Sequence, residues 1–187
     1  RTRRPTVFSK DFWYFESIID NKIANVSQLE KNDVLILSFP FFGDFQIKEK
    51  DGTWIITEPA WREANIERLE MPIIGRATCH KLMWEPLRGV LNQIEAEGLG
   101  YTLSKEEFRT SGGCYAPRRI SRFDAGGSIS RHAWGIAIDI NTKSGYHPRV
   151  VEIFNSWGFA WGGTWTSPDE MHFELRDLSA SISKSGG

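Results

Sequence analysis

Residues 130–139 (SRHAWGIAID) and residues 169–174 (DEMHFE) are the two stretches that decide how this chain is interpreted. They contain two of the four histidines, and Asp139 follows the first of them, His132, by seven residues. In a β-strand, residues two apart share a face. We therefore expect Ala137 and Asp139 to point one way, while the isoleucines that alternate with them point into the core.

His132 has the wrong parity to share that face in an unbroken strand, so the pattern predicts a bend at Gly135 that returns it toward Asp139. In the second stretch Met171, Phe173 and Leu175 alternate as core residues, which turns His172 and Glu174 to the other side. His132, Asp139 and His172 are then candidates for one metal site. Three protein ligands plus a water is the arrangement of a catalytic zinc.

A catalytic zinc also needs a carboxylate that takes the proton of the attacking water. Asp169, in a loop expected after Pro168, is in a position to do this, while Glu170 points away if the strand has already begun. From the residue types alone, two incidental histidines and a locally hydrogen-bonded Asp139 explain the pattern about as well as a metal site.

A family resemblance favours the metal site. The patterns that carry it are Ser130-x-His132-x-x-Gly135-x-Ala137-x-Asp139 and Asp169-x-x-His172-Phe173-Glu174. They resemble the signature of the D-alanyl-D-alanine carboxypeptidase family of zinc peptidases, which includes L-alanyl-D-glutamate endopeptidases of phage endolysins and bacterial autolysins. The zinc-site architecture is shared with the hedgehog signalling domain. Residues 113–118 (GCYAPR) and 159–165 (FAWGGTW) also resemble family segments, and the similarity covers about residues 68–178.

The resemblance implies that His132, Asp139 and His172 bind Zn²⁺ and that Asp169 is the general acid and base. It also implies a substrate-binding arginine, which we assign to Arg118.

Three further residues come with the resemblance. Arg119 stays an alternative to Arg118, because the register there is open. Ser130 either supports the site through a hydrogen bond or is a simple turn residue. Glu174 is a candidate to orient a ligand histidine, as carboxylates near zinc often do.

The implied activity is hydrolysis of amide bonds in peptidoglycan stem peptides, most simply as an L-alanyl-D-glutamate endopeptidase. A D-alanyl-D-alanine carboxypeptidase is the alternative within the family, and a non-catalytic, zinc-stabilised binding module is the alternative of another class. An enzyme of this kind acts on the cell wall, in the periplasm, outside the cell, or after release from the cytoplasm if it is an endolysin.

The periodicity predicts helices over residues 10–26, 77–97 and 148–157 and strands within 34–42, 53–57, 135–140 and 171–175, with a long loop over 111–131. This order predicts an α+β fold, with a small antiparallel sheet that carries the zinc site and helices that flank it, as in hedgehog and D,D-peptidases. We expect an N-terminal extension over residues 1–60, a catalytic domain over 61–178 and a polar tail over 179–187.

Composition limits the other possibilities. Of 187 residues, 23 are Lys or Arg and 24 are Asp or Glu, so the net charge of −1 predicts no nucleic-acid partner. No apolar run approaches the roughly 18 residues of a membrane span, and no signal peptide is visible. Nothing predicts an oligomeric state. Cys79 and Cys114 are free to pair or to stay as thiols.

Two histidines and three tryptophans are expected to be structural rather than functional. We expect His80 to be a partly exposed helix residue and His147 a turn residue before a helix. Trp134, Trp161 and Trp165 either line a substrate groove or pack the core.

Overall fold

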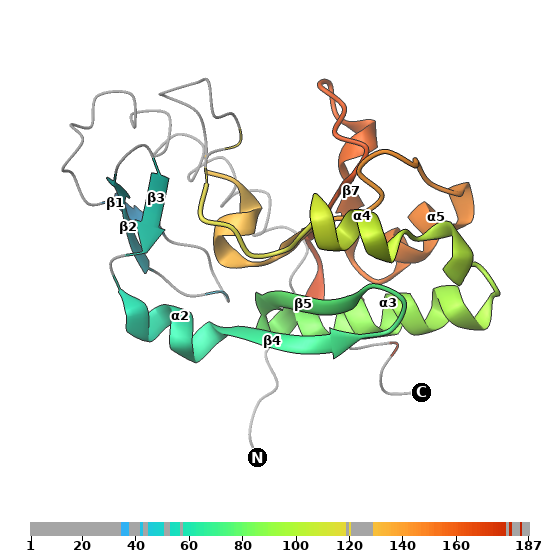
Figure 1. The fold of residues 1–187 in the computed structure, drawn as a ribbon, viewed down its shortest axis with the longest axis horizontal. Helices are drawn as coiled ribbons and strands as arrows, with labels where there is room; N and C mark the ends of the chain where they lie inside the picture. Colours follow the sequence, from blue (N-terminus) through green and yellow to red (C-terminus); the bar gives the residue numbers. More distant parts are fainter. Residues whose placement is uncertain are drawn as a thin grey trace, which may run out of the picture.

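The computed structural model describes residues 35–37, 42, 45–50, 53–56, 58–118, 120, 129–178, 180 and 184. In this part of the chain, small antiparallel sheets are flanked by helices, which confirms the predicted α+β class. Figure 1 shows the sheet of β1, β2 and β3 at one end of the molecule and α5 at the other, with the hairpin of β4 and β5 along one side.

The N-terminal sheet has the order β1-β2-β3, with strands at Leu35–Leu37, Phe45–Lys50 and Thr53–Ile56. Strands were predicted within residues 34–42 and 53–57, and both are present. The structure adds β2 between them, which pairs antiparallel with each. Phe45 and Ile47 of β2 are fully buried, so the alternate residues of this strand join the core.

The next elements are α2 (Pro59–Asn65), which begins with proline, and a hairpin of β4 (Ile66–Met71) and β5 (Gly75–His80). The helix predicted over 77–97 is wrong at its start, because residues 77–80 belong to β5. The short helix η2 (Lys81–Met83) then leads into α3 (Trp84–Ala96). Residues 77–80 form a strand and not a helix because they pair with β4, and strand preference depends on cross-strand neighbours.

This shift also corrects the expectation for His80. It is a strand residue with 1% of its surface exposed, not a partly exposed helix residue. The part of the predicted apolar stripe that lies in α3 is completely buried: Leu87, Val90, Leu91 and Ile94. Leu82, which the stripe also included, lies in η2 and is 39% exposed.

Helix α3 packs against α5 (Pro148–Ser156) through a close approach at Gly89. A Cβ atom on Gly89 would lie 2.2 Å from the Trp157 ring, so only glycine fits there. The Trp157 indole N–H then donates to the Gln93 side chain of α3 at 2.9 Å. His147 caps α5 by accepting from the Arg149 backbone N–H, as expected of a residue before a helix.

The third sheet holds the predicted site. It has the order β6-β8-β7, with β6 at Ala137–Asp139, β7 at Phe159–Trp161 and β8 at His172–Leu175, all antiparallel. The register sets Asp139 opposite His172. Strand β7 was not predicted, because its tryptophan- and glycine-rich surroundings do not alternate in hydrophobicity.

The connecting segments contain short helices at η3 (Gly100–Thr102), α4 (Lys105–Thr110), η4 (Arg131–Trp134) and η5 (Gly162–Thr164). None of the helices in the described ranges is long and apolar enough to cross a membrane. The helix predicted over 10–26, Arg119 and most of the tail over 179–187 lie outside the described residues. The domain division at residues 60 and 178 stays a prediction.

Candidate metal centre

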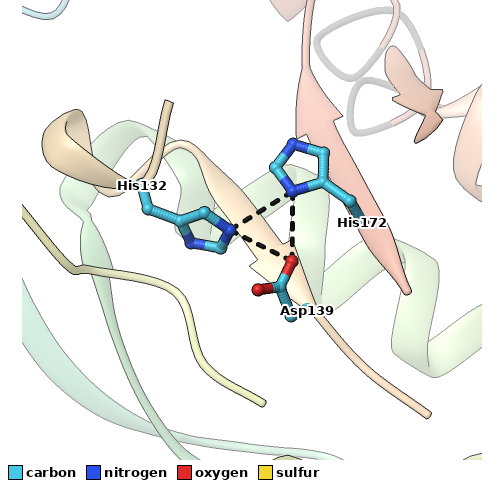
Figure 2. A group of neighbouring side chains, drawn as sticks. All are labelled: His132, Asp139 and His172. Carbon is cyan, nitrogen blue, oxygen red and sulfur yellow. Dashed lines mark hydrogen bonds and ion pairs between the residues drawn. The ribbon is translucent and has the colours of Figure 1, made fainter. Parts of the chain in front are cut away.

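Three short elements bring the candidate ligands together, as Figure 2 shows. His132 lies in η4, Asp139 ends β6 and His172 begins β8. Ser130 caps η4, because its hydroxyl accepts from the His132 backbone N–H at 3.3 Å. The predicted bend is present at Gly135, which has a φ of +69°. A Cβ there would lie 2.7 Å from the backbone nitrogen of His80 in β5, so both the backbone angle and the close approach require glycine.

The three donor atoms form a nearly equilateral triangle. Asp139 Oδ1 lies 3.0 Å from His132 Nε2 and 3.0 Å from His172 Nδ1, and the two nitrogens are 3.2 Å apart. All three residues are buried. A tetrahedral zinc with bonds of about 2.0–2.1 Å holds its ligand atoms about 3.3 Å apart. The triangle therefore has the size that one ion needs.

The remaining ring nitrogens fix which atoms carry protons. His132 Nδ1 lies 2.6 Å from the Cys114 carbonyl oxygen, which can only accept, so Nδ1–H donates and Nε2 keeps a lone pair. His172 Nε2 lies 3.1 Å from Glu174 Oε2, so Nε2–H donates and Nδ1 keeps a lone pair. When both rings are neutral, two lone pairs and a carboxylate oxygen face one another. A bound cation satisfies all three, which is why the donor set fits a metal.

The surrounding charges support this conclusion. Burial opposes the charged form of His172, but hydrogen bonds to Asp139 and Glu174 outweigh it and raise its pKa to about 9. Burial also opposes ionisation of Asp139, yet the His132 and His172 rings beside it hold its pKa well below the usual range. The metal-free site thus retains a proton near neutral pH, and a metal ion would displace it.

Glu174 is the carboxylate behind His172. Only 3% of its surface is exposed, and Oε1 accepts from the Arg176 guanidinium while Oε2 accepts from His172. Burial raises its pKa, but His172, Arg176 and Arg131 lower it to about 2. The strand alternation that predicted Glu174 and His172 on one face is therefore observed, and Glu174 stays ionised to hold the ring.

Arg118 lies beside the candidate metal site. Its Nη2 is 3.4 Å from Asp139 Oδ2, the carboxylate oxygen outside the donor triangle, and 31% of its side chain is exposed. Its carbonyl accepts from the Ser130 N–H at 3.0 Å. The structure thus brings Arg118, predicted to bind substrate, to the edge of the site.

Asp169 comes just before β8. Its carbonyl accepts from the His172 N–H at 3.2 Å, and its own N–H donates to Gly162 at 3.0 Å. Its side chain is half-buried, whereas Glu170 is exposed. Burial raises the pKa of Tyr146, and the negative charges of Asp139, Glu107 and Asp169 add to this. The charge of Asp169 therefore acts on the same hydroxyl group as the charge of Asp139.

Sequence reasoning missed two contributors to the site. Cys79 and Cys114 form a disulfide, which their spacing alone did not reveal. The Tyr146 hydroxyl donates to the carbonyl of Ile140 and lies 3.3 Å from that of Met171, so it ties the ends of β6 and β8 together. A tyrosine seven residues after a candidate ligand gives no signal of this in the sequence.

The three tryptophans differ in their placement. Trp134 is completely buried and packs edge-on against Phe45, 5.5 Å away, so it belongs to the core. Trp161 is half-buried and stacks on Phe173. Trp165 is 36% exposed and its ring centroid lies 5.2 Å from that of His172. Of these, Trp165 is the aromatic side chain that borders the metal site.

Fold and donor set together define a candidate centre for one catalytic metal ion. Residues 124–175 match the family model described as D-alanyl-D-alanine carboxypeptidase, which confirms the resemblance drawn from the motifs. The matched segment contains all three candidate ligands and Asp169. Neither the curated proteins nor the solved structures gave a match.

Proposed function

We propose that this protein is a zinc peptidase that hydrolyses amide bonds in the stem peptides of peptidoglycan, with L-alanyl-D-glutamate endopeptidase as its activity. The observation that carries the proposal is the buried triangle of His132 Nε2, Asp139 Oδ1 and His172 Nδ1, with both histidine tautomers fixed to leave lone pairs inward. The peptidase-family match over residues 124–175 gives that triangle its chemical context.

When bound to these residues, zinc would polarise the scissile carbonyl and lower the pKa of a water to about 7. Asp169 would take the proton of the attacking water and deliver it to the leaving amine. Arg118 would bind a substrate carboxylate or carbonyl oxygen, because its guanidinium is partly exposed at the edge of the site. Ser130 and Glu174 hold His132 and His172 in place.

Two activities compete within the family. The matched model is described as a carboxypeptidase, which favours removal of a terminal D-alanine. The tracts at residues 113–118 and 159–165 resemble the endolysin-like branch, which favours the endopeptidase. The non-catalytic module is disfavoured, because a binding module needs no carboxylate for proton transfer such as Asp169.

The proposed location is the cell wall, in the periplasm, outside the cell, or after release from the cytoplasm. The Cys79–Cys114 disulfide supports an oxidising compartment, since such bonds are rare in reducing cytosol. No nucleic-acid partner is proposed for a chain of net charge −1.

The test is to incubate the zinc-loaded protein with purified peptidoglycan and with two synthetic stem peptides, and to identify the products by mass spectrometry. One peptide offers only the L-Ala–D-Glu bond and the other only a D-Ala–D-Ala terminus. We expect cleavage of the first. Release of D-alanine from the second alone would favour the carboxypeptidase. A protein that holds zinc and cleaves neither bond is the non-catalytic module.

A further inference from the structure

The Cys79–Cys114 disulfide joins β5 to a chain segment that hydrogen-bonds two of the candidate metal ligands. Both cysteines are buried, and their Cα atoms are 5.4 Å apart. We call residues 113–116 the bracing segment. It runs between β5 on one side and the ends of η4 and β6 on the other.

The bracing segment contacts two of the three candidate ligands through its backbone. Gly113 and Asp139 exchange two backbone hydrogen bonds, of 3.1 Å and 2.8 Å. The Ala116 N–H donates to the His132 carbonyl at 2.9 Å. Between these contacts, the Cys114 carbonyl accepts from His132 Nδ1–H at 2.6 Å. Cys114 thus takes part in the disulfide, and its carbonyl sets the tautomer and the angle of the His132 ring.

We propose that this disulfide is part of the scaffold of the metal site, so that the oxidised protein binds zinc more tightly than the reduced protein. Cys114 is the positioning residue, and it acts through its carbonyl on His132. The inference rests on the fit of the donor set to a metal, and it does not require that the protein cleaves peptides.

The expected size follows from how ligand orientation affects affinity. Changing a group that hydrogen-bonds a ligand histidine typically weakens metal binding by about 10–100-fold. Without the disulfide, the bracing segment keeps its hydrogen bond from the Tyr115 N–H to the Thr78 carbonyl, at 3.0 Å, and stays attached to β5. Reduction therefore loosens the Cys114 carbonyl without removing it, and we expect the low end of that range, about tenfold.

The redox step is a two-electron exchange. On reduction the S–S bond breaks and takes up two electrons and two protons, which gives two thiols. With a trialkylphosphine, phosphorus supplies the electrons and becomes the phosphine oxide, with its oxygen from water. In a cell the reverse step needs a disulfide-type oxidant, which is itself reduced to two thiols. Because the bond is buried, its state is expected to be set as the chain folds.

The experiment compares the zinc affinity of the oxidised and reduced full chain. The protein is reduced in denaturant with a trialkylphosphine, refolded without oxygen, and checked by thiol counting and near-ultraviolet circular dichroism. Affinity is then measured at low temperature by competition with a fluorescent zinc chelator. We expect binding about tenfold weaker after reduction.

Two double variants keep the test decisive. Cys79→Ala with Cys114→Ala removes both sulfurs, and Cys79→Val with Cys114→Ala restores apolar volume in case the first variant does not fold. Either folded variant should bind zinc as weakly as the reduced protein and should not respond to phosphine. Since these variants have no thiol, they also exclude zinc binding by free cysteines.

A second measurement uses the reciprocity of linked equilibria. If oxidation tightens zinc binding tenfold, zinc must lower the reduction potential of the disulfide by about 30 mV, provided that the reduced protein is folded. This shift is read from thiol alkylation in glutathione buffers at fixed free zinc. Equal zinc affinity in folded oxidised and reduced protein, or no shift in potential, would overturn the proposal. The disulfide would then only stabilise the fold. Its reduction would lower Tm and leave the zinc affinity unchanged. Zinc affinity that depends on oxidation in a protein that cleaves no peptide would refute the proposed function and leave this inference intact.

Discussion

Two buried histidines in this protein have opposite electrostatic surroundings. His80 is 1% exposed and His172 is 5% exposed, so burial does not distinguish them. The pKa of His80 is lowered to about 4, whereas the pKa of His172 is raised to about 9. The difference comes from their neighbours and not from their depth.

His80 lies among aromatic rings. Phe42 contacts it edge-on at a centroid distance of 5.2 Å, and Trp61 lies 6.2 Å away. Its Nδ1 accepts from the Leu82 N–H at 3.1 Å, which uses that lone pair. Burial lowers its pKa, and the charge of Lys81 adds to this against the opposing effect of the Phe42 carbonyl. A neutral histidine with its lone pair engaged is a structural residue.

His172 lies between two ionised carboxylates, Asp139 and Glu174. A cation near its Nδ1 is stabilised, whether that cation is a proton or a metal ion. His172 thus differs from His80 in having two acidic groups and a second inward-facing histidine nitrogen beside it.

The largest effect is expected from removing a ligand. His132→Ala or His172→Ala should reduce zinc affinity by about 10³-fold or more, because each ligand contributes several kcal/mol to binding. His80→Asn is the matched control, since its side-chain oxygen can still accept from the Leu82 N–H. Metal analysis after dialysis should find near-stoichiometric zinc in the control and almost none in the ligand variants. Full zinc retention in both ligand variants would rule out the site.

Asp169→Asn is expected to lower turnover by about 10²–10⁴-fold, the usual contribution of a general base. Asparagine matches the shape of aspartate but cannot take up a proton from water. Zinc content and Tm should stay near those of the wild type. Glu170→Gln, next to it and exposed, is the control and should remain active. Loss of activity in the control but not in Asp169→Asn would assign the proton transfer to Glu170.

In the metal-free protein, the opposite pKa shifts of His80 and His172 should make the free energy of unfolding depend on pH. A lowered pKa means that His80 contributes stability above its unfolded value of 6.5, which is lost as the pH falls toward 4. A raised pKa means that His172 contributes stability below 6.5, which is lost as the pH rises through 9. Each contribution is about 3 kcal/mol.

Denaturant unfolding between pH 4.5 and pH 10 in the presence of a chelator measures the loss of stability at low pH (the acidic arm) and at high pH (the basic arm). His80→Asn should flatten the acidic arm alone. His172→Asn should remove the contribution of His172 to the basic arm. If His80→Asn leaves the acidic arm unchanged, burial among aromatic rings is not what keeps His80 neutral.

The smallest effect is expected from Glu174→Gln, which keeps the shape of the side chain behind His172 but removes its charge. Zinc affinity should fall by about 10–100-fold, since the His172 ring is held less firmly and is less basic. Competition with a chelator measures the change, with Glu170→Gln as the control. An affinity equal to that of the wild type would mean that Glu174 serves only to pair with Arg176.

Much of the candidate site could be predicted from the sequence because it depends on local geometry. The alternation that ends in Asp139, the bend at Gly135 and the shared face of His172 and Glu174 follow from the period of a strand. The structure brings these residues together, and the family match covers them. The helix stripe of α3 was visible for the same reason, since its apolar period continues over three turns.

Only the tertiary structure determined which residues far apart in the sequence contact one another. Residues 77–80 became a strand because β4 pairs with them, and that pairing buried His80 among rings from distant segments. The Cys114 carbonyl reached His132, and Cys79 reached Cys114, because the bracing segment runs between β5 and β6. Such contacts join residues 18 to 35 positions apart. Local preference does not encode them, because their free energy comes from packing and hydrogen bonds that exist only after the chain has closed.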